Sequence, residues 1–280
     1  SGKPNNSTFE TAAKNVIIEN NTVDGIARLC ELRQTENVTI TGNTIKNTSL
    51  HGMLLTVDKG TYSGDVTITD NTADGIHNRF VRMAGAGNAE VVIKDNYIYN
   101  YQGADADYIK VTDGSNVTIE NNVLMVTSAV DLQSRVNSAA KGLNEFGFAN
   151  DITGNVTIPQ NDKINIVING LGKKYDGTIT VDGNSRSGGS ETLVIKNINF
   201  EHSGSNLYFV EQNIAPNYPH NVTVEDCTFK GDGTSVIGGI RYRQGFNNVV
   251  KNCTAEGLYL FIWTTGGNNI TIDNVDGIGY

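Results

Sequence analysis

Short stretches in which apolar and polar residues alternate recur along the whole chain. A typical one is Asn37-Val-Thr-Ile-Thr-Gly-Asn43. Alternation with a period of two over five or six residues predicts a strand with one buried face. The Asn, Asp and Gly residues that close each stretch are typical of turns. The basic unit of the chain is therefore predicted to be a short strand followed by a tight bend. The closest copies occupy residues 15–21, 37–43, 65–71, 90–96 and 116–122, and looser copies occupy 193–197, 221–226, 248–252 and 269–274.

The spacing of these copies predicts how they are arranged. The leading valines Val16, Val38, Val66, Val91 and Val117 follow one another at intervals of 22, 28, 25 and 26 residues. A unit of this length cannot bury its own apolar face, whereas stacked neighbours can, so a solenoid with coils of about 25 residues is predicted. The Asn that ends each stretch is expected to point inward and pair with the Asn of the next coil.

These stretches resemble the repeats of the pectate-lyase-like superfamily over nearly the whole chain. The resemblance implies an all-β fold, the right-handed parallel β-helix. It does not imply an activity, because this fold is found in lyases, hydrolases, phage tailspikes, adhesins and structural modules.

One segment departs from the repeat and predicts a short amphipathic helix near residues 128–142. Ser128-Ala-Val-Asp131 is a capping box, Leu132 and Val136 follow at helical spacing, and Gly142 is expected to end the helix. The segment resembles the helix that closes the N-terminal end of many β-helices. Short strands predicted at 152–158, 164–168 and 178–182 follow it, as they would follow such a cap.

The mid-chain cap predicts two parts, residues 1–127 and residues 128–280. The chain could hold the end of one solenoid and the start of the next, as in a tandem array. Alternatively it could be circularly permuted, with residues 128–280 beginning one continuous solenoid, and we favour this reading. Joining the two ends would place Ile270 and Val16 26 residues apart, one full coil. That count fits both arrangements, and it also fits end-to-end self-association of molecules.

Charge and composition limit the kinds of partner that the chain is expected to bind. The net charge of −9 would repel a phosphate backbone, so nucleic acid is not an expected partner. Runs of 18 apolar residues are missing from the sequence, so membrane insertion is not expected either. Of the three cysteines, Cys30, Cys227 and Cys253, the last two lie 26 residues apart in similar strings. They are expected in adjacent coils, where a disulfide could form but is not required.

A second strand precedes many of the repeats, and its outward residues suggest a binding face. Arginines, carboxylates and a Trp on one sheet are what a sugar-binding groove uses, through bidentate hydrogen bonds and ring stacking. The same pattern is also typical of ordinary cross-strand pairs on any soluble sheet. If the chain ends join, the residues would form one stripe: Phe209, Glu211, Arg241, Arg243, Phe261, Trp263, Glu31, Arg33, Thr56, Asp58, Arg82 and Lys110.

Candidates for catalysis are fewer. Glu31, Asp58 and Glu211 are the acids that could act as catalytic groups, but Arg33 would keep Glu31 and Asp58 ionised. Polysaccharide lyases of the resembled superfamily use an acidic calcium cluster with a nearby base. The nearest candidates here are Asp105 and Asp107 beside Lys110, or Asp58 beside Arg82, and neither group supplies enough oxygen ligands for a convincing calcium site. A cofactor is therefore not expected, and calcium is the one candidate.

The sequence thus favours a non-catalytic module, secreted or displayed on a bacterial or phage surface, that binds a polysaccharide or surface glycan or serves a structural role. Two alternatives remain open. One is a carbohydrate-active enzyme, either a polysaccharide lyase or a glycoside hydrolase. The other is a rearranged or engineered β-helix with no function of its own.

Overall fold

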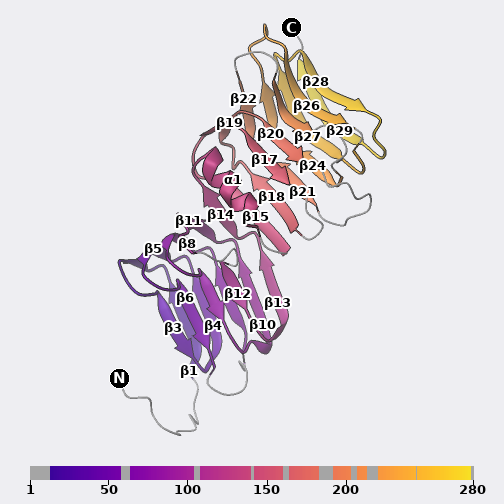
Figure 1. The fold of residues 1–280 in the computed structure, drawn as a ribbon. Helices are drawn as coiled ribbons and strands as arrows, with labels where there is room; N and C mark the ends of the chain where they lie inside the picture. The colour runs from indigo at the N-terminus through magenta and orange to yellow at the C-terminus, as the bar shows by residue number, and fades with distance from the viewer. Residues whose placement is uncertain are drawn as a thin grey trace. The chain divides into compact units, whose positions relative to one another are not determined.

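The computed structural model describes residues 13–57, 64–103, 108–139, 142–159, 164–182, 192–202, 207–212, 220–243 and 245–278. The chain divides into two compact units, residues 1–123 and residues 124–280, and each is taken by itself below (Figure 1). Within the described ranges, every helix is too short or too polar to cross a membrane.

The first unit is built from coils that each contribute a strand to three parallel sheets. The first sheet runs in the order β1 (Ala13–Glu19), β4 (Thr35–Thr41), β7 (Val66–Thr69), β10 (Gly87–Lys94) and β13 (Gly114–Glu120). The second runs β2 (Thr22–Asp24), β5 (Thr44–Thr48), β8 (Thr72–Ile76) and β11 (Tyr97–Tyr99). The third runs β3 (Cys30–Arg33), β6 (Met53–Thr56), β9 (Val81–Met83) and β12 (Ile109–Val111).

The repeats stack in register, as their spacing predicts. Val38 pairs with Val66, and Val66 with Val91, while Ile40 and Ile68 pair two residues further on. All five of these residues are almost completely buried in the core. Because valine lies on valine and isoleucine on isoleucine, each coil covers the apolar face of its neighbour. The predicted parallel β-helix is confirmed.

The predicted inward ladder of asparagines is also present in the first unit. The side-chain amide of Asn43 donates to Oδ1 of Asn71 at 3.0 Å, and Asn71 donates to Oδ1 of Asn96 at 3.0 Å. The ladder continues to Asn122 at 2.7 Å and begins at Asn21, whose amide donates to Asn43. Each buried amide also donates to backbone carbonyls, as Asn71 does to Ile40 and Thr69. The ladder thus satisfies polar groups at a bend that lies inside the core.

The second unit repeats the plan. One sheet contains β14 (Val123–Val126), β15 (Gly142–Phe148), β18 (Ile164–Asn169), β21 (Leu193–Lys196) and β24 (Val222–Glu225). Another contains β16 (Ile152–Thr153), β19 (Lys174–Asp176), β22 (Asn199–Glu201) and β25 (Thr228–Lys230). The long strand β27 (Val249–Glu256) pairs with both β24 and β25, and β29 (Thr271–Ile278) pairs with β27. The remaining sheet contains β17 (Val156–Pro159), β20 (Ile179–Asp182), β23 (Leu207–Gln212), β26 (Ile237–Arg243) and β28 (Leu260–Thr265).

The predicted cap helix is α1 (Ala129–Asn137), at the start of the second unit. Ser128 caps it by accepting the backbone N–H of Asp131 at 3.1 Å. Ala129, Leu132 and Val136 form its buried face. The helix is shorter than predicted because Ser138 ends it, and Gly142 instead begins β15.

A single side chain of this helix covers the open edge of β17, the first strand of the sheet β17, β20, β23, β26 and β28. The amide nitrogen of Gln133 donates to the carbonyl of Thr157 in β17 at 2.8 Å. The Thr157 N–H in turn donates to Oε1 of Gln133 at 2.7 Å. One side-chain amide therefore takes the place of a neighbouring strand. Because an unpaired strand edge invites association with another chain, this contact protects the start of the solenoid.

Candidate functional site

In the second unit, the sheet formed by β17, β20, β23, β26 and β28 brings together residues that lie far apart in the sequence. Glu211 of β23 pairs in register with Arg241 of β26, and Arg241 pairs with Trp263 of β28. Adjacent strands lie about 4.8 Å apart, so these side chains form one outward column across three coils. The predicted grouping of Glu211, Arg241 and Trp263 is therefore found within this unit.

Arg241 is the centre of the column. Its guanidinium forms an ion pair with Glu211 and lies over the Tyr208 ring, 4.6 Å from the ring centroid. It also lies 5.6 Å from the Trp263 centroid, and the two ring centroids are 6.0 Å apart. Arg243 also lies 5.6 Å from Trp263. We call Tyr208, Glu211, Arg241, Arg243 and Trp263 the arginine–aromatic cluster. Each guanidinium is attracted to the negative face of a ring, so the members of the cluster hold one another in place.

Tyr208 was not predicted, although the sequence contains a signal for it. Tyr208 pairs with Gly238 in the next coil. A Cβ atom at Gly238 would lie 2.2 Å from Cε1 of Tyr208, so only glycine leaves room for the ring. A glycine in a strand often marks a place where a neighbouring group approaches closely. A glycine opposite a large aromatic residue therefore indicates that the aromatic side chain lies across it.

The electrostatics of the cluster favour binding over proton transfer. Burial lowers the pKa of Arg241, and the charge of Arg243 lowers it further. The Arg241 side chain is 15% exposed, and its Nε is buried without a hydrogen-bond partner in the described part of the chain. Glu211 is committed to the ion pair with Arg241. An arginine beside a carboxylate favours the ionised form, so Glu211 is poorly suited to act as an acid.

In the first unit, the third sheet carries the other predicted residues. Glu31 pairs with Leu54, Leu54 with Arg82, and Arg82 with Lys110. Leu54 therefore separates Glu31 from the cationic pair of Arg82 and Lys110. These two like charges lie directly opposite each other, an arrangement that is unfavourable without a counter-ion.

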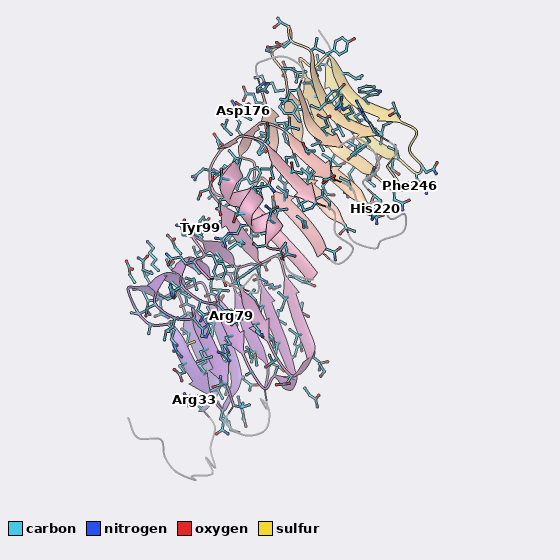
Figure 2. The ribbon with its side chains drawn as sticks, viewed as in Figure 1. Arg33, Arg79, Tyr99, Asp176, His220 and Phe246 are labelled. Atoms are coloured by element: carbon cyan, nitrogen blue, oxygen red, sulfur yellow. The ribbon has the colours of Figure 1, made fainter. Side chains whose placement is uncertain are left out.

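Glu31 is held between two arginines. Its Oε1 accepts from Nη2 of Arg33 at 2.6 Å, and its Oε2 accepts from Nη1 of Arg28 at 2.6 Å. The hydrogen bond from Arg33 is the main cause that lowers the pKa of Glu31, with the charges of Arg28 and Arg33 adding to it. This carboxylate is ionised at neutral pH. Figure 2 labels Arg33, at the end of β3.

Several predicted residues do not join either group. Asp58, Asp105 and Asp107 lie outside the described residues, so a pair of Glu31 with Asp58 and a calcium site at Asp105 and Asp107 stay predictions. Thr56 pairs in register with Arg33. In the part of the chain that the structure describes, groups of three or more His, Cys, Asp or Glu that could hold a metal are not found. One stripe running from Glu211 to Lys110 would need both units, and it stays a prediction.

The outward placement predicted for Phe209 and Phe261 is wrong. Phe209 is fully buried, and its ring lies 5.5 Å from Phe200. The Phe261 ring lies 5.4 Å from that of Phe229, a core residue. A Cβ atom at Gly239 would lie 2.8 Å from Cδ2 of Phe261, so this glycine leaves room for the ring. Phe209 and the next residue, Val210, are both buried, so the strict alternation of inward and outward residues is interrupted at this point.

Two of the histidines, His51 and His220, are buried. His51 is 7% exposed, and its Nδ1 accepts the backbone N–H of Arg79 at 3.3 Å. Burial lowers the pKa of His51, and the charges of Arg82, Arg28 and Arg79 lower it further. His202 pairs with Asp176 at 2.6 Å in the second unit, a contact that sequence reasoning missed. Arg79 and Asp176 are labelled in Figure 2.

Comparisons of the chain with protein-family models, with curated proteins and with solved structures found no match. What the chain does is therefore argued from its geometry.

Proposed function

We propose that this chain is a non-catalytic β-helix module of the pectate-lyase-like type that binds a glycan on the arginine–aromatic cluster. The observation that carries the proposal is the register of Glu211, Arg241 and Trp263, with Tyr208 and Arg243 packed against them. Sugar rings stack on Trp and Tyr, while guanidinium and carboxylate groups bond to hydroxyl and carboxyl oxygens. In this proposal the module is secreted or displayed on a bacterial or phage surface.

The cluster supplies its groups already ordered. Arg241 is held by an ion pair and by two neighbouring rings, so little side-chain freedom is lost when a ligand binds. The two arginines of the cluster, Arg241 and Arg243, carry the planar N–H donors that recognise carboxylate groups. An acidic glycan is therefore a better fit than a neutral one.

The pairing of Glu211 and Glu31 with arginines supports binding rather than turnover. Glycoside hydrolysis needs one carboxyl group with a raised pKa and a second carboxylate within about 5–10 Å. Glu211 and Glu31 are each paired with arginine, which acts in the opposite direction. The carbohydrate-active enzyme and the rearranged or engineered β-helix remain as outcomes of the test.

The binding test compares two aromatic variants of the second unit. Acidic and neutral polysaccharides are screened on a glycan array, and affinities of the hits are measured by calorimetry. We expect Trp263→Ala to weaken binding at least tenfold, since stacking residues of this kind commonly contribute over 1 kcal/mol. Tyr259→Ala is the matched control, because Tyr259 is 64% exposed and lies outside the cluster. Its affinity should stay within about twofold of the original.

Turnover is tested with the same polysaccharides. Reducing-sugar release detects hydrolysis, and absorbance of unsaturated products detects lyase action. Release of either product would overturn the non-catalytic assignment in favour of the enzyme. Binding to none of the glycans would overturn the glycan assignment and leave a structural role or a β-helix with no function of its own.

A further inference from the structure

In the second unit, two cysteines occupy the place that the asparagine ladder holds in the first. Cys227 follows β24 as Asn43 follows β4, and Cys253 takes the same position one coil later. The Asn43 amide donates to the carbonyl two residues back, that of Thr41, at 3.0 Å. Cys227 Sγ makes the same contact with Glu225 at 3.2 Å, and Cys253 Sγ with Lys251 at 3.2 Å. The thiols therefore point into the core as the amides do.

The two cysteines lie directly beside each other. Glu225 pairs with Lys251 before them, and Thr228 pairs with Thr254 after them. The Thr254 N–H donates to the Cys227 carbonyl at 3.0 Å, so the two coils are in contact at this point. In-register neighbours on parallel strands are about 4.8 Å apart at Cα, within the range of about 4.4–6.8 Å that a disulfide spans.

The thiols also differ in acidity. A hydrogen bond from Cys227 is the main cause that lowers the pKa of Cys253. Burial is the main cause that raises the pKa of Cys227, and the same hydrogen bond adds to it. Both side chains are buried and both cysteines are free thiols in the structure. By contrast, Cys30 is a buried cysteine of the first unit whose pKa burial raises to about 12.

We propose that Cys227 and Cys253 are a redox pair that closes into a disulfide between adjacent coils, with a low-molecular-weight disulfide as the oxidant. The Cys253 thiolate attacks one sulfur of the oxidant, forms a mixed disulfide and releases the other half as a thiolate. The Cys227 thiolate then attacks Sγ of Cys253 and releases the second half. The oxidant gains two electrons as two thiolates, and the two cysteine protons go to solvent or to those thiolates.

The bond would join two particular coils. Cys227 lies in the coil that continues into β26 and carries Arg241, while Cys253 lies in the coil that continues into β28 and carries Trp263. Oxidation would therefore covalently link the two coils that carry Arg241 and Trp263 of the arginine–aromatic cluster. The inference does not depend on glycan binding, because it concerns the covalent state of the core.

The experiment is refolding of the reduced, denatured full chain in a buffer of reduced and oxidised glutathione, so that burial does not limit access. We expect an intact mass lower by about 2 Da, from the loss of two hydrogens, and a linked peptide pair containing Cys227 and Cys253. Closing a loop of this length should raise the melting temperature by roughly 5–10 °C relative to the reduced protein. A thiol reductant should reverse both changes.

Three variants separate the proposal from its alternatives. Cys30→Ser should still form the link, whereas Cys227→Ser and Cys253→Ser should lose both the link and the gain in melting temperature. Circular dichroism of the two latter variants checks that they fold. The proposal is overturned if the folded chain keeps all its thiols free or if Cys30 takes part in the link. It is also overturned if a glutathione adduct persists and the disulfide between Cys227 and Cys253 does not form.

Discussion

At the scale of single residues, the buried asparagines show how a polar side chain is retained in an apolar core. Asn71 is fully buried, and its Oδ1 accepts from both the backbone N–H and the amide of Asn43. Its own amide reaches Ile40, Thr69 and Asn96. Every polar atom has a partner, so the cost of burial is met within the ladder. The sequence predicted this ladder because Asn recurs at the same point of each repeat.

Asn71→Ala should strongly destabilise the first unit. Removing the amide leaves several buried donors and acceptors without partners, and each unsatisfied group costs about 1–3 kcal/mol. We expect a loss of about 3 kcal/mol or more, read as a lower urea midpoint. Asn21→Ala is the control, because Asn21 occupies the same turn position at the exposed end of the ladder. If both variants show the same decrease in urea midpoint, the buried hydrogen-bond network is not the cause of the destabilisation.

Glu31 carries a pH dependence whose sign follows from its lowered pKa. A carboxyl group with a folded pKa below its unfolded value, about 4.3, stabilises the fold above that value and loses the effect as pH falls through the folded pKa. Titration of the Glu31 carboxyl carbon by NMR should give a pKa below 4.3. Arg33→Ala should move it upward, toward 4.3. Arg82→Ala should leave it in place, because Leu54 lies between Arg82 and Glu31; equal shifts in the two variants would contradict the assignment.

At the scale of strands and helices, the sequence predicts those features that repetition makes visible. Valine spacing predicted the register, and the capping box predicted α1. Alternation predicted that Arg241 and Trp263 point outward, but it failed at Phe209 and Phe261, where the alternation is interrupted. Such an interruption changes which face a residue occupies without changing its type, so a periodic pattern cannot reveal it. Tyr208 was missed for a related reason, since its role depends on a glycine in the next coil.

Gly238→Ala tests whether that glycine positions the cluster. The added methyl group would overlap the Tyr208 ring, so the ring should leave the Arg241 guanidinium. We expect a change in the near-ultraviolet circular dichroism of Tyr208 and Trp263 and weaker binding of any glycan found by the array. Gly277→Ala is the matched control, because its Cβ would meet only the Phe261 ring, at 3.9 Å. An unchanged spectrum for Gly238→Ala would show that the strand simply shifts to make room.

The contact between Gln133 and β17 makes a prediction for α1. Gln133→Ala removes both hydrogen bonds to Thr157 and leaves the edge of β17 open. We expect faster hydrogen exchange at the Thr157 amide, by tenfold or more if about 1.4 kcal/mol is lost, and a greater tendency to aggregate. Ser134→Ala, on the exposed face of the same helix, should change neither. Equal exchange rates in the two variants would mean that packing of Leu132 and Val136 is enough to protect the edge.

At the scale of the whole molecule, the chain has two units, each with its own stacked core. The asparagine ladder belongs to the first, whereas the stack of Phe148, Tyr175, Phe200 and Phe229 belongs to the second. The mid-chain cap was predicted from sequence, but the choice between a tandem array and a permuted solenoid was not resolved. Local patterns report what each coil packs against, and the two arrangements share the same local patterns.

The two cores should therefore melt as separable transitions in differential scanning calorimetry. Stability in a solenoid is carried by each coil and its neighbours, so a change in one unit acts mainly on that unit. Asn71→Ala should lower one transition by several degrees, and Gln133→Ala should lower the other, with the second transition of each variant nearly unmoved. The double variant should show both shifts, and they should add. A single transition that both substitutions lower equally would contradict this expectation, because it would mean that the units unfold as one cooperative solenoid.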